Sequence, residues 1–166
     1  MTTETATILQ PAKIFKRVVK LMGNRFEISV VVDADKNMFA EKCINSAVDE
    51  IQRIESLLTT YKDDSQTNLI NAAAGSHAVK VDREVFDLIE RSLKISEITQ
   101  GAFDISYGSI DKRLWNFDRN MTVLPDAATA KKMIRLINYR NIILNKDLCS
   151  IFLKEKGMRI GFGGIG

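Results

Sequence analysis

The chain has 166 residues, of which 45% are hydrophobic and 27% are charged, with 24 Lys and Arg side chains against 21 Asp and Glu. This composition is typical of a folded globular protein, and the longest aliphatic runs, of three residues, fall far short of the roughly 20 that a transmembrane helix needs. The net charge of +3 divides into an acidic part, residues 1–111, and a basic part, residues 112–166, but Lys and Arg adjoin in pairs at most, so we expect no nucleic-acid partner.

Residues 1–12 are expected to form a flexible tail. The N-terminus lacks the basic and then apolar segments of a signal peptide. We therefore expect a cytoplasmic protein, or a membrane-anchored periplasmic lipoprotein if a leader has been removed. The two cysteines, Cys43 and Cys149, have no CxxC spacing, which fits a reducing compartment.

The first predicted elements are two strands and a long helix. Apolar residues alternate over 26–32, which is typical of a half-buried strand, and residues 14–19 are its expected partner. The intervening Met22-Gly23-Asn24 predicts the turn of a hairpin. From Asn37 to about Tyr61, apolar residues recur every three or four positions, which predicts a long amphipathic helix.

Two further helices and a brief strand follow. Residues 65–74 predict a short helix with Ser65 as its N-cap and Gly75 as its left-handed end. Residues 79–81 predict the strand. The second helix begins after the capping Asp82 and ends before Gly101.

The last third of the chain begins with residues 101–117, an aromatic and acidic stretch without a clean period, which favours a functional loop. Residues 126–137 predict a helix capped by their first residue, an aspartate. Residues 142–153 predict a β-hairpin, and residues 158–160 predict the start of another strand. The order of elements favours an α+β fold in which an antiparallel sheet packs against helices.

The chain ends on Gly161-Phe162-Gly163-Gly164-Ile165-Gly166, a Gly-rich stretch that would have nothing to pack over it, so we expect a truncated domain. The stretch matches G-x-G-x-x-G, the signature of a nicotinamide dehydrogenase, but that assignment needs a following helix and a later acidic residue. A tight glycine turn beside a ligand is the other interpretation, and the preceding hairpin favours it.

Single residues leave alternatives open. Tyr61, at the end of the long helix, has a ring that can stack on a heteroaromatic ligand or pack at the helix end. Asp104 and Asp111 are suited to a hard cation or a ribose, or are ordinary surface acids. Asn68 and Asn71 read as ordinary helix and turn residues.

Taken in order, four blocks of the sequence resemble the FAD:protein FMN transferases, the ApbE-type flavin transferases. The resemblance spans roughly residues 14–166. The blocks are Met22-Gly23, RIESLLTTYKDDSQTNLINAAAG (53–75), GAFDISYGSIDKRLWNF (101–117) and INYRNIILNKDLCSIFLKEKGMRIGFGGIG (137–166). The resemblance implies the N-terminal half of an ApbE-like fold and an enzyme that transfers FMN from FAD to a Thr or Ser hydroxyl of an acceptor protein, releasing AMP.

The resemblance also implies the site residues. Met22 would border the flavin and Tyr61 would stack on its isoalloxazine ring, while Ala102, Phe103 and Asp104 would line the FAD site. For Asp104 we expect a flavin contact rather than a packing role, because the acid stands in an otherwise apolar segment directly after a helix end.

A magnesium ion is the implied cofactor, with the main-chain carbonyl of Gly166 as one ligand. The carboxylate ligands and the catalytic base would lie beyond residue 166, so the 166-residue chain alone is expected to be inactive. Gly161 stands where the family commonly has an acid, which removes any contact from that side chain. The competing hypothesis is a non-catalytic module that binds flavin or a partner protein.

Overall fold

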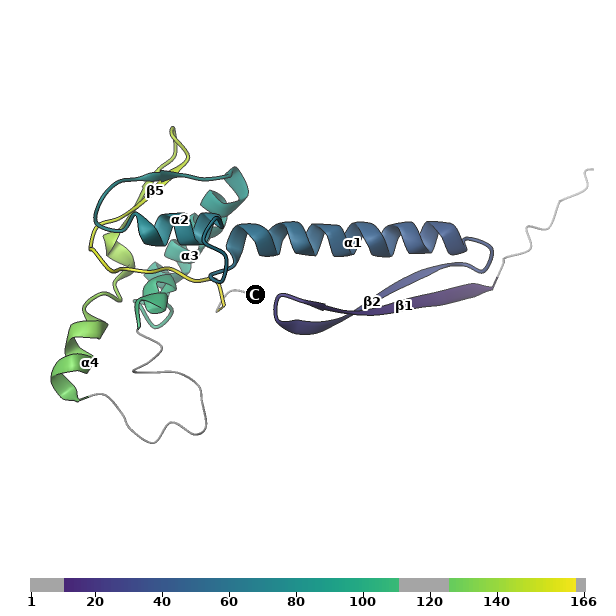
Figure 1. Cartoon of the computed structure of the whole chain (residues 1–166), viewed down its shortest axis with the longest axis horizontal. Coiled ribbons are helices and arrows are strands. Elements are labelled where there is room, and N and C mark those ends of the chain that lie inside the picture. The colour runs from purple at the N-terminus through teal and green to yellow at the C-terminus, as the bar shows by residue number, and fades with distance from the viewer. Residues whose placement is uncertain (1–10, 111–125, 164–166) are drawn as a thin grey trace, which may run out of the picture. The chain divides into compact units, whose positions relative to one another are not determined.

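A computed structural model describes residues 11–110 and 126–163. The chain divides into two compact units, residues 1–56 and residues 57–166, which are described separately (Figure 1).

The first unit begins with the predicted hairpin. Strands β1 (Ala12–Leu21) and β2 (Asn24–Asp33) pair antiparallel over their whole length, from Ala12 opposite Asp33 to Leu21 opposite Asn24. Met22 and Gly23 form the two-residue turn, with φ of +50° and +73°. Two positive φ angles match the twist of the flanking strands, so the hairpin is confirmed at the predicted turn.

Helix α1 (Asn37–Leu58) runs alongside this hairpin within the first unit (Figure 1). Its buried residues, Ala40 and Ile44, are one turn apart and therefore share a face. Arg17 of β1 donates hydrogen bonds to Glu41 and Asn45 of the same helix. The helix is confirmed, although it ends before Tyr61.

The second unit combines a small sheet with short helices. In it, β5 (Ser150–Leu153) pairs antiparallel with both β3 (Val79–Lys80) and β4 (Ile142–Asn145), and the sheet order is β3-β5-β4. Its elements are α2 (Gln66–Ala72), β3 (Val79–Lys80), α3 (Arg83–Ile98), the 3-10 helix η1 (Ile105–Ser109), α4 (Ala127–Ile134), the 3-10 helix η2 (Tyr139–Asn141), β4 (Ile142–Asn145) and β5 (Ser150–Leu153). In the described part of the chain the strand pairs are antiparallel, as predicted for an α+β fold, and they form two small sheets, one in each unit.

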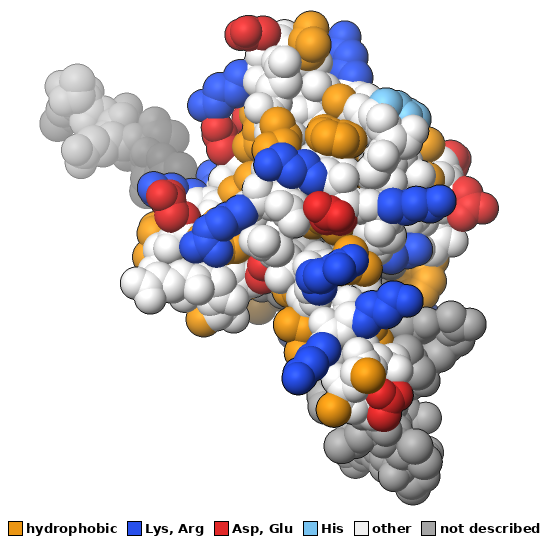
Figure 2. Space-filling view, turned by 90° about the vertical axis from the view of Figure 1, so that its left-hand side faces the viewer, with side chains coloured by type: hydrophobic (Ala, Val, Ile, Leu, Met, Phe, Trp, Pro, Cys, Tyr) orange, Lys and Arg blue, Asp and Glu red, His pale blue; other side chains and the backbone are white. Residues whose placement is uncertain are grey.

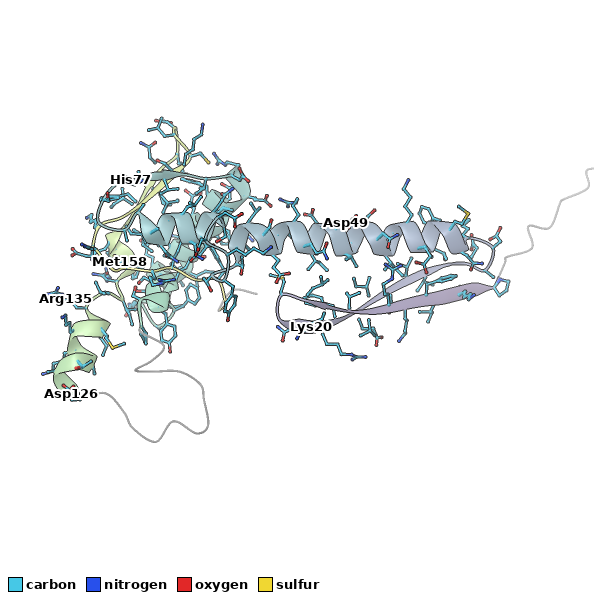
Figure 3. All side chains as sticks on the ribbon, viewed as in Figure 1. Lys20, Asp49, His77, Asp126, Arg135 and Met158 are labelled. Carbon is cyan, nitrogen blue, oxygen red and sulfur yellow. The ribbon has the colours of Figure 1, made fainter. Side chains whose placement is uncertain are left out.

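Two of the three predicted N-terminal helix caps form their side-chain hydrogen bonds. The Ser65 hydroxyl accepts from the amide of Asn68, and the Asp126 carboxylate accepts from the amides of Ala128 and Thr129 at the start of α4 (Figure 3). Asp82 occupies the N-cap position of α3, but its side chain makes no capping hydrogen bond.

Residues 158–160 are predicted to start a strand, but in the structure they do not pair with another strand. Met158 and Ile160 are nevertheless fully buried, and Met158 lies among the side chains of the second unit (Figure 3). The backbone of this segment bonds to the side chains of Asn71 and Ser109 instead of to a neighbouring strand. These side chains satisfy the groups that a strand partner would otherwise satisfy.

The core of the second unit gathers apolar residues from nearly every element. Its members are Ile70, Ala74, Val81, Val85, Phe86, Ile89, Ile105, Ile142, Ile151, Leu153, Met158 and Ile160. Within the described ranges, every buried side-chain nitrogen or oxygen has a hydrogen-bond partner. Among those same residues, the helices are all too short or too polar to cross a bilayer.

Candidate functional site

Tyr61 lies in the loop between α1 and α2, and its side chain is 88% exposed. Two side chains of the α2 region hold this loop. The Ser65 hydroxyl donates to the Thr59 carbonyl at 2.6 Å, and the side-chain amide of Asn68 donates to the Lys62 carbonyl at 2.8 Å. The aromatic ring therefore stands on an anchored loop, where one face can receive a planar ligand.

The segment that carries Ala102 and Phe103 follows α3 directly. Gln100 and Gly101 both have positive φ, +53° and +87°, which turns the chain away from the helix. The Thr99 hydroxyl then accepts from the amide of Phe103 at 3.1 Å. Ala102 is exposed, whereas Phe103 packs partly against the core.

Asp104 has a structural task. One carboxylate oxygen accepts from the amide and the hydroxyl of Ser106, at 2.8 and 2.6 Å, and the other accepts from the amide of Tyr139 at 2.9 Å. The carboxylate caps η1 and ties it to a segment more than 30 residues away. Asp104 therefore has a structural role beside the predicted one, and its contact with FAD stays a prediction.

The first residue of the Gly-rich stretch, Gly161, is hydrogen-bonded to the same loop. The amide of Gly161 donates to the carbonyl of Ile105 at 3.2 Å, and the Asn71 side chain bonds to both backbone groups of Ile160. The structure therefore brings residues 102–110 and 158–161 together. Sequence reasoning missed Asn71, although a lone amide inside the apolar run 69–74 could have identified it.

Met22 belongs to the first unit. It lies in the turn of the hairpin with a side chain that is 41% exposed and a φ of +50°. A bulky residue in this left-handed conformation is uncommon, because glycine or asparagine would be less strained there. Its predicted flavin contact stays a prediction.

The described residues do not build a metal site. No group of three or more His, Cys, Asp or Glu side chains in residues 11–110 and 126–163 is arranged to hold a metal ion. Gly166, the predicted carbonyl ligand, lies outside the described residues, as does Asp111. Mg²⁺ therefore stays a prediction, and none of the described residues is assigned to it.

Two surface hollows of about 520 and 430 Å³ lie over the small sheet of the second unit and share Ala78, Leu148 and Ser150. Neither is lined by a residue predicted to bind flavin. On the face drawn in Figure 2, Lys and Arg side chains stand among acidic and hydrophobic ones. The candidate site therefore stays with the residues that the family resemblance implies, Tyr61, the 102–104 segment and the Gly-rich stretch. Of these, hydrogen bonds join the loop 102–110 to the start of the Gly-rich stretch.

Solved structures of flavin transferases share this fold. The chain aligns with the ApbE protein of Thermotoga maritima at a TM-score of 0.76 and 22% identity, over 92% of this chain and 48% of that one. It aligns with the apo flavinyl transferase ApbE of Pseudomonas stutzeri at a TM-score of 0.77 and 19% identity, over 96% and 50%. The fold is therefore that of the ApbE flavin transferases.

The sequence matches the ApbE family over residues 22–166, and the chain belongs to this family. It is 37% identical over 115 residues to an FAD:protein FMN transferase of Klebsiella pneumoniae, covering 69% of this chain and 36% of the relative. It is 30% identical over 131 residues to one of Treponema pallidum, covering 74% and 36%. The chain thus spans little more than a third of these two relatives.

Proposed function

We propose that the whole protein transfers FMN from FAD to a Thr or Ser hydroxyl of an acceptor protein and releases AMP. The match to the ApbE family over residues 22–166 carries this proposal. Relatives named FAD:protein FMN transferase support it, since their matching segments include the stretches around Tyr61 and the 102–104 segment.

In the proposed reaction, the acceptor hydroxyl oxygen attacks the FMN phosphorus of FAD. The phosphorus–oxygen bond to the AMP phosphate breaks, AMP leaves, and the hydroxyl proton passes to water, so that FMN becomes joined to the protein through a phosphodiester. The described residues serve binding in this proposal: Tyr61 stacks on the isoalloxazine, residues 102–104 line the FAD site, and Met22 borders the flavin.

We propose Mg²⁺ as the metal of the whole protein, on the family resemblance alone. Such an ion neutralises charge on the diphosphate when it is bound. Because the described residues hold no metal cluster, we assign none of them to the ion and derive no step through it.

The proposal is tested with the whole protein, FAD, Mg²⁺ and an acceptor protein, by following AMP release and covalent fluorescent flavin on a denaturing gel. We expect both products, and we expect a metal chelator to abolish them. FAD binding without AMP release would favour a non-catalytic flavin-binding module instead. The 166-residue chain alone is expected to give no transfer in the same assay.

Replacing the exposed ring of Tyr61 is expected to weaken flavin binding. Tyr61→Ala in the whole protein should reduce FAD affinity by about 1–3 kcal/mol, the scale of base–aromatic stacking, whereas Tyr61→Phe should stay close to the parent. Because the side chain is 88% exposed, neither change should alter folding stability much. Quenching of FAD fluorescence measures the affinity, and equal affinity of Tyr61→Ala and the parent would refute the stacking role.

A further inference from the structure

The backbone of Arg159 and Ile160 is held by two side chains from distant parts of the second unit. The amide of Ile160 donates to Asn71 Oδ1 at 2.7 Å, and Asn71 Nδ2 donates back to the carbonyl of Ile160 at 3.1 Å. The amide of Arg159 donates to the Ser109 hydroxyl at 2.9 Å. That hydroxyl lies 3.1 Å from the carbonyl of Arg159 and 3.3 Å from that of Leu136, to one of which it donates.

Only a carboxamide fits the place of Asn71. Its side chain accepts from one backbone group of Ile160 and donates to the other, as a neighbouring strand would do. An aspartate would set a carboxylate against the Ile160 carbonyl, and an apolar residue would leave two buried backbone groups unpaired. Asn71 is 9% exposed and Ser109 is 8% exposed, so water cannot readily take the place of either side chain.

Close approach of the loop reinforces this arrangement. A Cβ on Gly108 would lie 3.1 Å from the carbonyl carbon of Ile160 and 3.2 Å from the carbonyl oxygen of Arg159. Gly108 therefore lets the chain beside Ser109 lie directly on the segment. The segment is held by α2 through Asn71 and by η1 through Ser109.

The glycines that follow this segment differ from Gly108. Among the described atoms, a Cβ on Gly161 or Gly163 would meet nothing within 4 Å, and neither residue has a left-handed φ. Packing and backbone conformation in the described residues thus do not require glycine at these two positions. Open space beside the backbone of these two glycines suits a phosphate group, which binds main-chain amides. The amide of Gly161 is already bonded to the Ile105 carbonyl, so the amides offered to such a group are those of Phe162 and Gly163.

We propose that Asn71 and Ser109 are positioning residues for the transfer reaction, an inference that rests on the proposed function. Their hydrogen bonds fix the backbone of Arg159 and Ile160, and thereby aim the main chain of Gly161–Gly163 at the diphosphate of FAD. Neither side chain needs to touch the flavin or the reacting phosphorus. A misplacement of about 1 Å in such a site can cost about a hundredfold in rate.

The test uses Ser109→Ala, Ser109→Thr and Asn71→Asp in the whole protein, with Ser92→Ala as the matched control. Ser92 is equally a buried serine of the second unit, but its hydroxyl donates to the Leu88 carbonyl inside α3, away from the Gly-rich segment. All rates are measured at a temperature at which circular dichroism shows the variants folded, and FAD affinity is measured separately by fluorescence.

We expect Ser109→Ala and Asn71→Asp to lower kcat for AMP release by about ten- to a hundredfold, with the KM for the acceptor protein unchanged. Ser109→Thr, which keeps the hydroxyl, should recover much of the rate, and Ser92→Ala should match the parent. FAD affinity should fall in Ser109→Ala and Asn71→Asp as well. If Asn71→Asp does not fold, the two Ser109 variants decide.

A folded Ser109→Ala protein with the parent's kcat and FAD affinity would overturn the positioning role. If the parent releases no AMP, the proposed function is overturned instead. The FAD affinities of Ser109→Ala and Ser92→Ala would then decide whether Ser109 positions the Gly-rich segment. A parent that binds no FAD would overturn both.

Discussion

Gly75→Ala is expected to lower the thermal midpoint of the second unit by about 10 °C or more. Gly75 has a φ of +75°, a conformation that costs a residue with a Cβ roughly 1–2 kcal/mol. That Cβ would also lie 2.6 Å from the nitrogen and 2.8 Å from the Cα of Lys156, both backbone atoms that cannot rotate away. Together the two terms amount to about 2–4 kcal/mol, and each kcal/mol shifts the midpoint by roughly 4–8 °C.

Gly157→Ala is the matched control for this prediction. Gly157 has a comparable φ of +88°, but a Cβ there would lie 3.6 Å from the end of the Leu136 side chain, an ordinary contact. It should therefore show the backbone cost alone. Thermal unfolding of both variants and the parent, followed by circular dichroism, measures the difference. Equal midpoints for Gly75→Ala and Gly157→Ala would contradict the steric argument.

The effect of Gly75 extends to the candidate site. Its amide donates to the carbonyl of Leu153 at 2.8 Å, which joins the end of α2 to the end of β5. Helix α2 carries Asn71 on its buried side. A displacement at Gly75 would therefore shift the side chain that holds Ile160.

Local features of the fold could be predicted from the sequence because each depends on residues close together in the chain. The positive φ angles of Met22 and Gly23 and the Ser65 cap follow from neighbours within three positions. Asp82 shows the limit of such reasoning. Its backbone amide donates to the Gln66 side chain, a contact 16 residues away, and its own carboxylate does not cap α3.

The polar contacts that build the site could not be predicted, because they join distant segments. Asn71 and Ile160 are 89 residues apart, and Ser109 and Arg159 are 50 apart. The sequence pattern predicted residues 158–160 as a strand because two apolar residues flank a polar one. It could not show that the backbone between them would bond to side chains instead of to another strand.

Asp104→Asn is expected to lose folding stability and FAD affinity together. An asparagine keeps one acceptor oxygen, so its amide nitrogen would face a donor, either the amide of Tyr139 or that of Ser106. At least one hydrogen bond is lost and two donors face each other, at a cost of about 1–3 kcal/mol of folding free energy. The loss of FAD affinity comes from the flavin contact that the family resemblance predicts.

Ser106→Ala separates the two effects. It removes the hydroxyl that donates to Asp104 at 2.6 Å and accepts from the amide of Asn138 at 2.9 Å, but it leaves the carboxylate in place. We expect urea unfolding to show comparable destabilisation of Ser106→Ala and Asp104→Asn. FAD titration below the unfolding transition should show weakened binding in Asp104→Asn alone. If FAD affinity is unchanged in both variants, Asp104 has a structural role only. Losing its carboxylate would then loosen the loop 102–110 without removing a flavin contact.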